Sequence, residues 1–240
     1  MKILAIIPAR YASTRFPGKP LVEIQGKSMI QHVYEQCKKA HSLTEVIVAT
    51  EDERIMAHVL AFGGKVEMTS PAHLTGTDRV AEVAEKYPDF EAYLNIQGDE
   101  PFIAPEAITI LCQKMREEQP QIATLIHKIA DFSQLSNPNV VKVVRDNKGY
   151  ALYFSRSSIP FLRNMPVTKH TFYQHVGIYG FNKATLQAVS ALSPTSLELA
   201  ESLEQLRWLE NGFSILTVIT DYQSIAIDTP TDLERANALP

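Results

Sequence analysis

The first half of the chain alternates between short apolar runs and helix-like segments, and this alternation restricts the fold more than any other feature. Residues 3–7 and 46–50 are apolar or β-branched runs typical of buried strands, and 66–69 and 93–96 are two shorter ones. Helices are expected between and after them, at residues 29–40, 53–62, 78–87 and 105–118. Strands alternating with helices predict an α/β fold of Rossmann-like type, with a mostly parallel sheet wrapped by helices.

The second half changes character, because strand-like runs follow one another with few helices between them. The expected strands are residues 122–129, 140–145, 151–155, 176–181 and 215–220. The sequence D-N-K-G at 146–149 favours a hairpin turn, a long amphipathic helix is expected over 197–210, and a closing helix over 230–238. We predict one domain over residues 1–240, in which about residues 130–210 form a smaller mixed lobe inserted on the same sheet.

Composition excludes several classes of protein. A chain of 240 residues can bury a sizeable core, and its net charge of −4 argues against a nucleic-acid partner. Cys37 and Cys112 lie in expected helices outside any C-x-x-C pattern, so we predict buried packing for both. No apolar stretch approaches the ~20 residues of a spanning helix, and the first run is too short for a signal peptide. We expect a cytoplasmic protein without membrane insertion.

A cationic loop follows the first expected strand. Residues 7–21 read I-P-A-R-Y-A-S-T-R-F-P-G-K-P-L, and the three prolines exclude a helix. Arg10, Arg15 and Lys19 thereby reach the carboxyl end of a parallel strand, where open α/β sheets bind ligands. Guanidinium groups grip phosphate oxygens in pairs, and a lysine adds a point charge. The loop therefore predicts a polyphosphate site, and the alternative is a solvated surface loop.

Other known site motifs do not fit the chain. Lys19 is followed by Pro20, where a Walker A loop carries Ser or Thr, and no G-x-G-x-x-G follows the first strand. A G-x-S-x-G elbow is also missing, so a hydrolase triad is not supported.

Two carboxylates follow runs that we expect to be strands. Asp99 comes after residues 93–96, and Asp228 comes after the apolar run 225–227. Carboxylates at strand ends, completed by substrate phosphates and waters, suit Mg²⁺. For Asp228 there is an alternative, because Asp228-Thr229-Pro230 before a helical run is also typical of a helix N-cap.

The segment Gly76-Thr77-Asp78-Arg79 opens an expected helix. Its backbone amides could bind a base or a phosphate. The sequence alone favours a capping turn instead, with Thr77 as the N-cap. Gln97 follows the strand before Asp99, and its side chain offers both a donor and an acceptor to a base or a sugar. The alternative for Gln97 is a hydrogen bond at the sheet edge.

Further polar candidates lie in the second half. His175 and Tyr179 are four residues apart on an expected strand, so they share a face. Glu204 and Gln205 lie on the expected long helix, whose apolar stripe is Leu199, Leu203, Leu206 and Leu209. From the residues alone, Glu204 is a solvated side chain and His175 a half-buried histidine.

In these motifs the chain resembles the 3-deoxy-manno-octulosonate (Kdo) cytidylyltransferase family. The resemblance covers nearly the whole chain in the family's order: the cationic loop, G-T-D-R at 76–79, N-I-Q-G-D-E-P at 95–101, and residues 150–159, 175–181, 203–207 and 228–233. It implies a nucleotidyltransferase that uses CTP and Kdo to make CMP-Kdo and pyrophosphate for lipopolysaccharide assembly. It also implies Mg²⁺ as cofactor and a homodimer formed through the second-half lobe, where Phe161, Phe172 and Trp208 are expected to be exposed.

The resemblance also assigns residues. Catalysis is assigned to Arg10, Arg15, Lys19 and Asp99, and metal binding to Asp99 and Asp228. The nucleotide contacts are Ala9, Arg10, Ser13, Arg15, Lys19, Gly76, Arg79 and Gln97. The sugar contacts are Gln97, Arg156, His175, Tyr179, Glu204 and Gln205, with Arg156 on the sugar carboxylate.

Two alternatives to this function stay open at the level of sequence. Segment 161–174 is shorter than in other members of the family, a departure that concerns the sugar contacts more than the nucleotide contacts. The first alternative is therefore a related acidic sugar as substrate, such as an 8-amino Kdo or a nonulosonic acid. A catalytically inactive nucleotide-binding protein is the second alternative, and the joint presence of Lys19, Asp99 and Asp228 argues against it.

Overall fold

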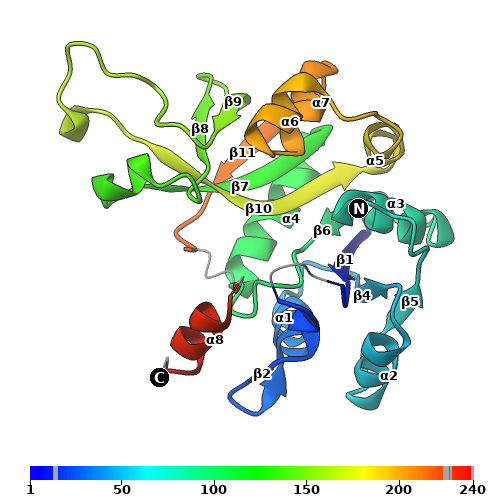
Figure 1. The fold of residues 1–240 in the computed structure, drawn as a ribbon. Helices are drawn as coiled ribbons and strands as arrows, with labels where there is room; N and C mark the ends of the chain where they lie inside the picture. The colour runs from blue at the N-terminus through cyan, green and yellow to red at the C-terminus, as the bar shows by residue number, and fades with distance from the viewer. Residues whose placement is uncertain (13–15, 224–226, 228, 239–240) are drawn as a thin grey trace.

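The computed structural model describes residues 1–12, 16–223, 227 and 229–238. In this part of the chain, nine strands form one sheet in the order β11-β7-β10-β6-β1-β4-β5, while β8 pairs with β10 and β9 pairs with β8 (Figure 1). The nine strands are β1 (Ile3–Ala9), β4 (Glu45–Thr50), β5 (Val66–Met68), β6 (Ala92–Asn95), β7 (Ile122–Lys128), β8 (Lys142–Arg145), β9 (Ala151–Ser155), β10 (Tyr173–Asn182) and β11 (Ile215–Ile219).

The central part of this sheet, from β11 to β5, is mostly parallel, as the alternation of strands and helices predicts. The strands β6, β1, β4 and β5 pair in parallel, and so do β7 and β11. β10 runs antiparallel to both β6 and β7 and joins the two parallel groups. The carboxyl ends of β1, β4 and β6 therefore lie together at one edge, which is where parallel sheets place their ligand sites.

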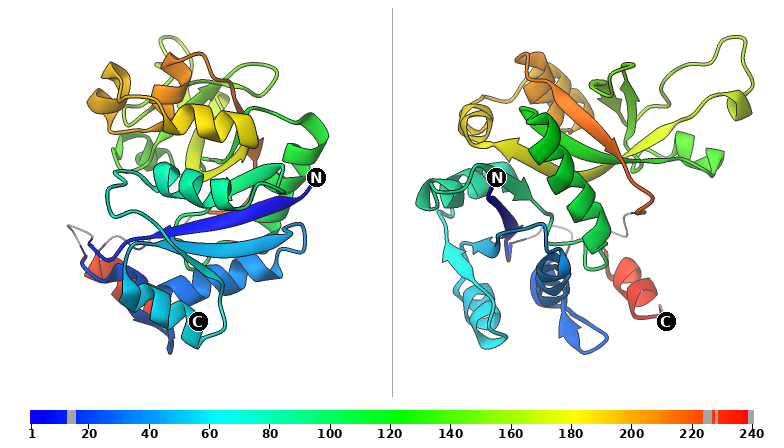
Figure 2. Two further views of the ribbon diagram at one scale, coloured as in Figure 1. Left: turned by 90° about the vertical axis from the view of Figure 1, so that its right-hand side faces the viewer. Right: turned by 180° about the vertical axis from the view of Figure 1, so that it is seen from behind.

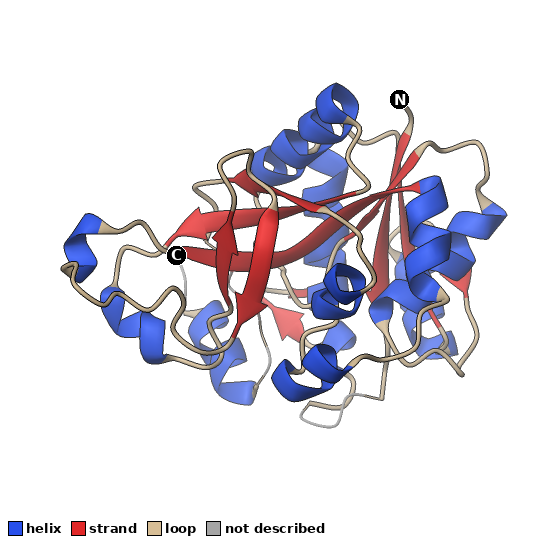
Figure 3. Cartoon of the chain, turned by 90° about the horizontal axis from the view of Figure 1, so that it is seen from above, coloured by secondary structure: helices blue, strands red, loops and turns tan. Residues whose placement is uncertain are grey.

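Helices cover both faces of the sheet (Figures 2 and 3). Alternate residues of β1 enter two apolar cores, Ile3 and Ile7 on one face and Leu4 and Ile6 on the other. The first face is covered by α1 (Met29–Lys39), α2 (Glu53–Ala61) and α4 (Pro105–Glu118). The second face is covered by α3 (Gly76–Lys86), α5 (Lys183–Ser190) and α7 (Gln205–Glu210), with α6 (Ser196–Glu201) beside α7.

Smaller elements complete the first half. A hairpin of β2 (Glu23–Ile24) and β3 (Lys27–Ser28) shares a small apolar cluster with the last helix, α8 (Pro230–Asn237). The short helical turn η1 (Lys19–Leu21) closes the cationic loop. None of the helices in the described ranges is both long and apolar enough to cross a membrane.

The second half carries a side extension on the same sheet. β8 and β9 form the hairpin that the D-N-K-G sequence predicts, and Gly149 adopts the positive φ of 94° that the turn needs. The turns η2 (Phe132–Ser136) and η3 (Val167–Lys169) belong to this extension, and the segment around η3 reaches away from the sheet in Figure 1.

Several sequence predictions for this half were wrong. The expected helix over 197–210 is two helices, because Ser202 between them adopts a left-handed φ of 51°. As a result Leu199 does not join the apolar stripe and is 70% exposed. Trp208 and Phe172 are buried, whereas Phe161 is exposed as predicted. Helix α5 was not predicted, and β8 begins two residues later than expected.

The prediction for the two cysteines was confirmed. Cys37 in α1 and Cys112 in α4 are both buried free thiols, and burial raises the pKa of each. Neither is therefore an accessible nucleophile.

Candidate active site

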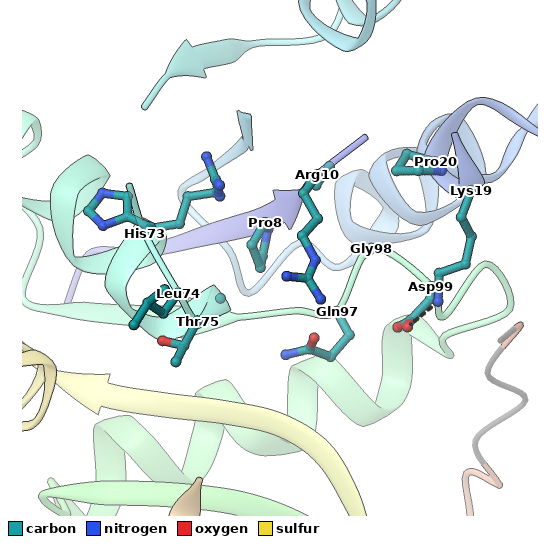
Figure 4. Close-up of a pocket in the computed structure, with 13 residues that line it drawn as sticks. Pro8, Arg10, Lys19, Pro20, His73, Leu74, Thr75, Gln97, Gly98 and Asp99 are labelled. Carbon is teal, nitrogen blue, oxygen red and sulfur yellow. Dashed lines mark hydrogen bonds and ion pairs between the residues drawn. The ribbon is translucent and has the colours of Figure 1, made fainter. Parts of the chain in front are cut away.

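A cavity of about 370 Å³ opens at the carboxyl ends of β1 and β6 (Figure 4). It is lined by the end of β1, the closing turn of the cationic loop, the start of α3 and the turn after β6. The lining residues are Pro8, Ala9, Arg10, Lys19, Pro20, His73, Leu74, Thr75, Gly76, Arg79, Gln97, Gly98 and Asp99. Three of these side chains are cationic and one is a carboxylate, so the cavity has the charge of a polyphosphate site with room for a metal ion.

Lys19 and Asp99 meet across this cavity. The Lys19 ammonium lies 2.7 Å from the Asp99 carboxylate, and both side chains are partly buried (Figure 4). Asp99 reaches this position because the chain passes close to β1 at Gly98, where a Cβ would lie 2.9 Å from the Pro8 carbonyl oxygen. Only glycine fits there. The sequence predicted both residues for this edge, and the structure brings them together.

The backbone of Tyr11 binds both Glu51 and a later residue of the cationic loop. Its backbone N–H donates to Glu51 over 3.2 Å, and its carbonyl accepts the Gly18 N–H over 2.9 Å. The Arg54 guanidinium stacks on the Tyr11 ring, 3.3 Å from the ring centroid. Gly18 has a φ of 72°, which favours glycine. The loop is therefore tied to the end of β4 as well as to its own closing turn.

Arg79 lines the cavity but is already paired. It is 5% exposed, and its guanidinium lies 2.7 Å from the Glu51 carboxylate and donates to the Thr69 hydroxyl. Burial lowers the pKa of Arg79, while the charge of Glu51 acts against this shift. Sequence reasoning missed Glu51, because a carboxylate after β4 gives no signal that it will neutralise an arginine on α3.

The start of α3 differs from the prediction. The N-cap is Thr75, whose hydroxyl accepts the Asp78 N–H over 3.1 Å, while the Asp78 carboxylate accepts the Thr75 N–H over 3.0 Å. This is a capping box, and it was missed because Thr77 fits the same composition two residues later. The Thr77 hydroxyl is left to donate to Glu204 over 2.9 Å. Gly76 lines the cavity, and its contact with a nucleotide stays a prediction.

The predicted sugar contacts divide into two groups. Gln97 lines the cavity, whereas the other predicted contacts are absent from its lining: Arg156, His175, Tyr179, Glu204 and Gln205. The His175 ring packs 5.3 Å from the Tyr179 ring, so these two side chains share a face as predicted. Burial lowers the pKa of His175 to about 3 and raises that of Tyr179. His175 is therefore neutral at pH 7.

Three buried polar atoms near these residues lack partners among the described residues, and one of them is the indole nitrogen of Trp208 beside Tyr179. The Tyr179 hydroxyl and the Gln205 amide nitrogen have no hydrogen-bond partner in the described part of the chain. Burying such groups unpaired costs about 1–3 kcal/mol each, which a ligand hydroxyl would recover. Glu204 is partnered, so its prediction as a solvated side chain from the residues alone was wrong: burial raises its pKa, and the hydrogen bonds from Thr77 and Thr75 lower it.

Arg156 holds the backbone of the second-half lobe. Its guanidinium donates to the carbonyls of Glu201, Pro138 and Ser202, over 2.7, 2.9 and 3.3 Å. The fully buried Lys142 ammonium donates to the carbonyls of Val140 and Asn137 and to that of Arg156 itself. Arg156 therefore fixes the strand β9 against the break between α6 and α7.

Three predicted site residues, Ser13, Arg15 and Asp228, lie outside the described residues. The cap of α8 is Thr229, not Asp228, with Asp232 completing a capping box. The N–H of Ile227 donates to the Asp99 carbonyl over 3.0 Å, so the backbone one residue before Asp228 lies beside Asp99.

The open parallel sheet, the cationic loop at its carboxyl edge and the facing carboxylate define a nucleotidyltransferase class of protein. The sequence model of the family described as cytidylyltransferase matches residues 4–218. The chain belongs to the 3-deoxy-manno-octulosonate cytidylyltransferase family within that class.

Relatives with that name are similar over nearly the full length. The one from Cytophaga hutchinsonii is 52% identical over 98% of this chain and 96% of its own, and the one from Bacteroides thetaiotaomicron is 52% identical over 98% and 97%. A solved structure of CMP:2-keto-3-deoxy-manno-octonic acid synthetase complexed with CTP matches with a TM-score of 0.94 and 45% identity, over 99% of this chain and 98% of that one.

A more distant solved structure shares the fold alone. A cytidylyltransferase from Leptospira borgpetersenii matches with a TM-score of 0.65 at 16% identity, over 99% of this chain and 85% of that one. The mostly parallel sheet flanked by helices is thus common to both neighbours.

Proposed function

We propose that this chain transfers the cytidylyl group of CTP to Kdo, giving CMP-Kdo and pyrophosphate for lipopolysaccharide synthesis. The observation that carries the proposal is the cavity at the ends of β1 and β6, where Arg10, Lys19 and Asp99 come together. The names of the full-length relatives and the CTP complex of the structural neighbour support the choice of substrates.

The reaction is a phosphoryl-type transfer. The anomeric hydroxyl of the sugar gives up its proton to water, and its oxygen attacks the α-phosphorus of CTP. The bond between the α-phosphorus and the oxygen that bridges to the β-phosphorus breaks, and pyrophosphate leaves with that oxygen. The proposed transfer is direct and has no covalent enzyme intermediate; the two cysteines are buried and do not line the cavity. Catalysis then consists of holding the two substrates in line and neutralising phosphate charge, which is the task of Arg10 and Lys19. Arg15 joins them in this proposal.

The residues of the cavity fit Mg²⁺. Asp99 presents a partly exposed carboxylate at the strand end, and Asp228 follows the residue that binds the Asp99 backbone. Hard oxygen ligands of this kind, completed by phosphate oxygens and waters, are what Mg²⁺ takes. Bound there, the ion would neutralise phosphate charge and favour the ionised sugar hydroxyl. Lys19 would move from Asp99 to a phosphate oxygen when both substrates are present.

The sugar is proposed to lie between Gln97 and α7. The partnerless Tyr179 hydroxyl and Gln205 amide nitrogen fit the hydroxyl groups of a polyol. Arg156 remains the proposed contact of the sugar carboxylate, although its guanidinium already donates to three carbonyls. A guanidinium has five N–H groups, so further donors are available.

We also propose a homodimer and a cytoplasmic location. Exposed apolar side chains gather in the second-half lobe, where Phe161 is 87% exposed and Leu152 and Met165 are also exposed. Two-fold dimers are the commonest way to cover such side chains. A monomer mass by light scattering at micromolar concentration would contradict the dimer. The cytoplasm is proposed because CTP is available there.

The test is a pyrophosphate-release screen of the purified protein with four nucleoside triphosphates and several acidic sugars, with and without Mg²⁺. We expect release only with CTP, Kdo and Mg²⁺ together. Faster release with an 8-amino Kdo or a nonulosonic acid would replace Kdo by that sugar. CTP binding without any release would support the alternative of an inactive nucleotide-binding protein.

A further inference from the structure

A line of hydrogen-bonded side chains connects the cavity to α7. The Gln97 amide nitrogen donates to the Asn95 side-chain oxygen over 3.2 Å. The Asn95 amide nitrogen lies 3.5 Å from the Thr77 hydroxyl, and that hydroxyl donates to the Glu204 carboxylate over 2.9 Å. Asn95 and Thr77 are 2% and 1% exposed. The inner two members of the line are therefore shielded from water, and water cannot replace their partners.

The acceptor at the far end fixes the direction of the line. Glu204 receives hydrogen bonds from the hydroxyls of Thr77 and Thr75, and the Arg207 guanidinium adds a favourable charge. The Thr75 hydroxyl accepts the Asp78 N–H as helix cap, so its own proton is free to be donated. Burial and the charge of Asp78 raise the pKa of Glu204, while the two hydroxyl donors and the cation act against that shift. In the structure the carboxylate oxygen that faces Thr77 is the acceptor of its hydroxyl proton.

Each following member then has one orientation. The single hydroxyl proton of Thr77 goes to Glu204, so Thr77 meets Asn95 with a lone pair and Asn95 must direct its NH₂ group toward Thr77. The Asn95 oxygen consequently faces Gln97 and accepts from its amide nitrogen. The Gln97 oxygen is the part left for the cavity, and in Figure 4 it is drawn on the side of Arg10.

We infer that Thr77 and Asn95 are positioning residues that set the orientation of the Gln97 amide, so that the site takes a ligand group that donates a hydrogen bond, such as a sugar hydroxyl. The inference rests on the proposed function and deepens it, because it names the polarity of one substrate contact. It also explains why Asn95 and Thr77 carry polar side chains, which the strand β6 and the helix α3 do not themselves need. A flipped Gln97 amide would face a hydroxyl donor with its NH₂ group and leave Asn95 without a donor.

A double-mutant cycle tests this inference. Thr77→Val removes the hydroxyl with little change of volume, and Gln97→Ala removes the group that is positioned. We expect each single variant to lower kcat/KM for Kdo about tenfold, because one hydrogen-bonded contact is lost or misdirected. Since Thr77 acts through Gln97, the double variant should lose about tenfold as well and not about a hundredfold. Additive losses would overturn the inference, because a merely structural effect of Thr77 is independent of Gln97.

Two controls keep the result interpretable. Thr77→Ser keeps the hydroxyl, so it should recover most of the activity lost in Thr77→Val; an equal loss in both would contradict the inference. If Thr77→Val does not fold, Thr77→Ala takes its place in the cycle. If the wild-type protein releases no pyrophosphate from CTP and Kdo, the proposed function is wrong. An active wild type with additive losses defeats only the orientation of Gln97.

Discussion

Two regions of this molecule are built in different ways: the region where we propose that the nucleotide binds, called the nucleotide side, and the region where we propose that the sugar binds, called the sugar side. The nucleotide side consists of β1, β4 and β6. Arg10 and Glu51 directly follow β1 and β4, and Asp99 lies in the turn after β6. The sugar side has to bring β9, β10 and α7 together, and it does so with buried polar groups. Lys142 and Arg156 bind six backbone carbonyls between them there.

The difference shows what places the polar side chains on each side. A residue at the end of a buried parallel strand is placed by local sequence, because the strand's register fixes it. A residue such as Glu204 is placed by contacts with segments more than a hundred positions away, such as Thr77. Changes on the nucleotide side should therefore affect chemistry with little effect on folding, whereas changes on the sugar side should affect both.

The largest effect is expected for Lys19→Ala. Loss of one charge that is proposed to meet the triphosphate of CTP should lower kcat by about 10²–10³, equivalent to roughly 2.7–4 kcal/mol. The thermal midpoint should stay close to that of the wild type, since Lys19 lies at the cavity and outside the apolar cores. Steady-state kinetics and thermal melts measure both, with the exposed Lys169→Ala as control. A variant that keeps more than about a tenth of the turnover would remove Lys19 from the phosphate contacts.

Asp99→Asn is expected to have the next largest effect. The amide keeps the shape but loses the charge that a hard cation needs, so Mg²⁺-dependent turnover should fall about a hundredfold. Binding of Mn²⁺, followed by paramagnetic resonance in the presence of CTP, should weaken in parallel. The exposed Asp89→Asn is the matched control. Unchanged Mn²⁺ binding in Asp99→Asn would contradict its assignment as a ligand.

Arg156→Ala should affect both folding and sugar binding. We expect the KM for Kdo to rise about tenfold and that for CTP to change little, because a contact of the sugar carboxylate is lost and the break before Glu204 loses its support. The thermal midpoint should also fall by several degrees. Arg163→Ala, an exposed arginine in the same lobe, is the control. Equal increases of KM for both substrates would place Arg156 in the nucleotide site or in the fold.

The smallest effect concerns pH and His175. Burial lowers its pKa in the folded state from 6.5 to about 3. The unfolded chain binds a proton here below pH 6.5 that the folded chain does not bind. The contribution of neutral His175 to the free energy of unfolding is therefore fully present above pH 6.5 and is lost as the pH falls toward 3.

His175→Gln removes this titration from the folded and the unfolded chain. The fall in thermal midpoint between pH 7 and pH 5 should therefore be smaller in His175→Gln than in the wild type, by a few degrees. The exposed His41→Gln should show the wild-type fall. An identical pH dependence in His175→Gln would mean that the ring protonates without cost in the folded protein.

Much of the fold could be read from the sequence. The bounds of α4 and β9 agree with the prediction, because Pro105 marks the helix start and the turn at 146–149 fixes the hairpin. The strands β1 and β4 were recognised for a similar reason, since buried parallel strands are continuous apolar runs. These signals are local in sequence and do not depend on which segments pack together.

The sequence also predicted which polar residues meet at the cavity, but not all of their partners. Arg10, Lys19, Gln97 and Asp99 line one cavity, as expected for polar residues that follow strands β1 and β6. Glu51 was not predictable, because its importance lies in neutralising Arg79, which comes from a different helix. The cap of α3 was placed two residues late, since Thr75 and Thr77 have equivalent capping chemistry and only the backbone geometry distinguishes them.

By itself, then, the sequence determined the parallel sheet, its cationic edge and the family of the protein, because periodicity and short motifs act over a few residues. Tertiary structure alone decided that the helix expected over 197–210 breaks at Ser202, whose carbonyl is held by Arg156. It also decided that Trp208 is buried against Tyr179 and Phe181, and that the Thr77 hydroxyl serves Glu204 and not the helix cap. Such contacts join residues that are distant in the chain, and their free energy exists only once the sheet and its helices have packed.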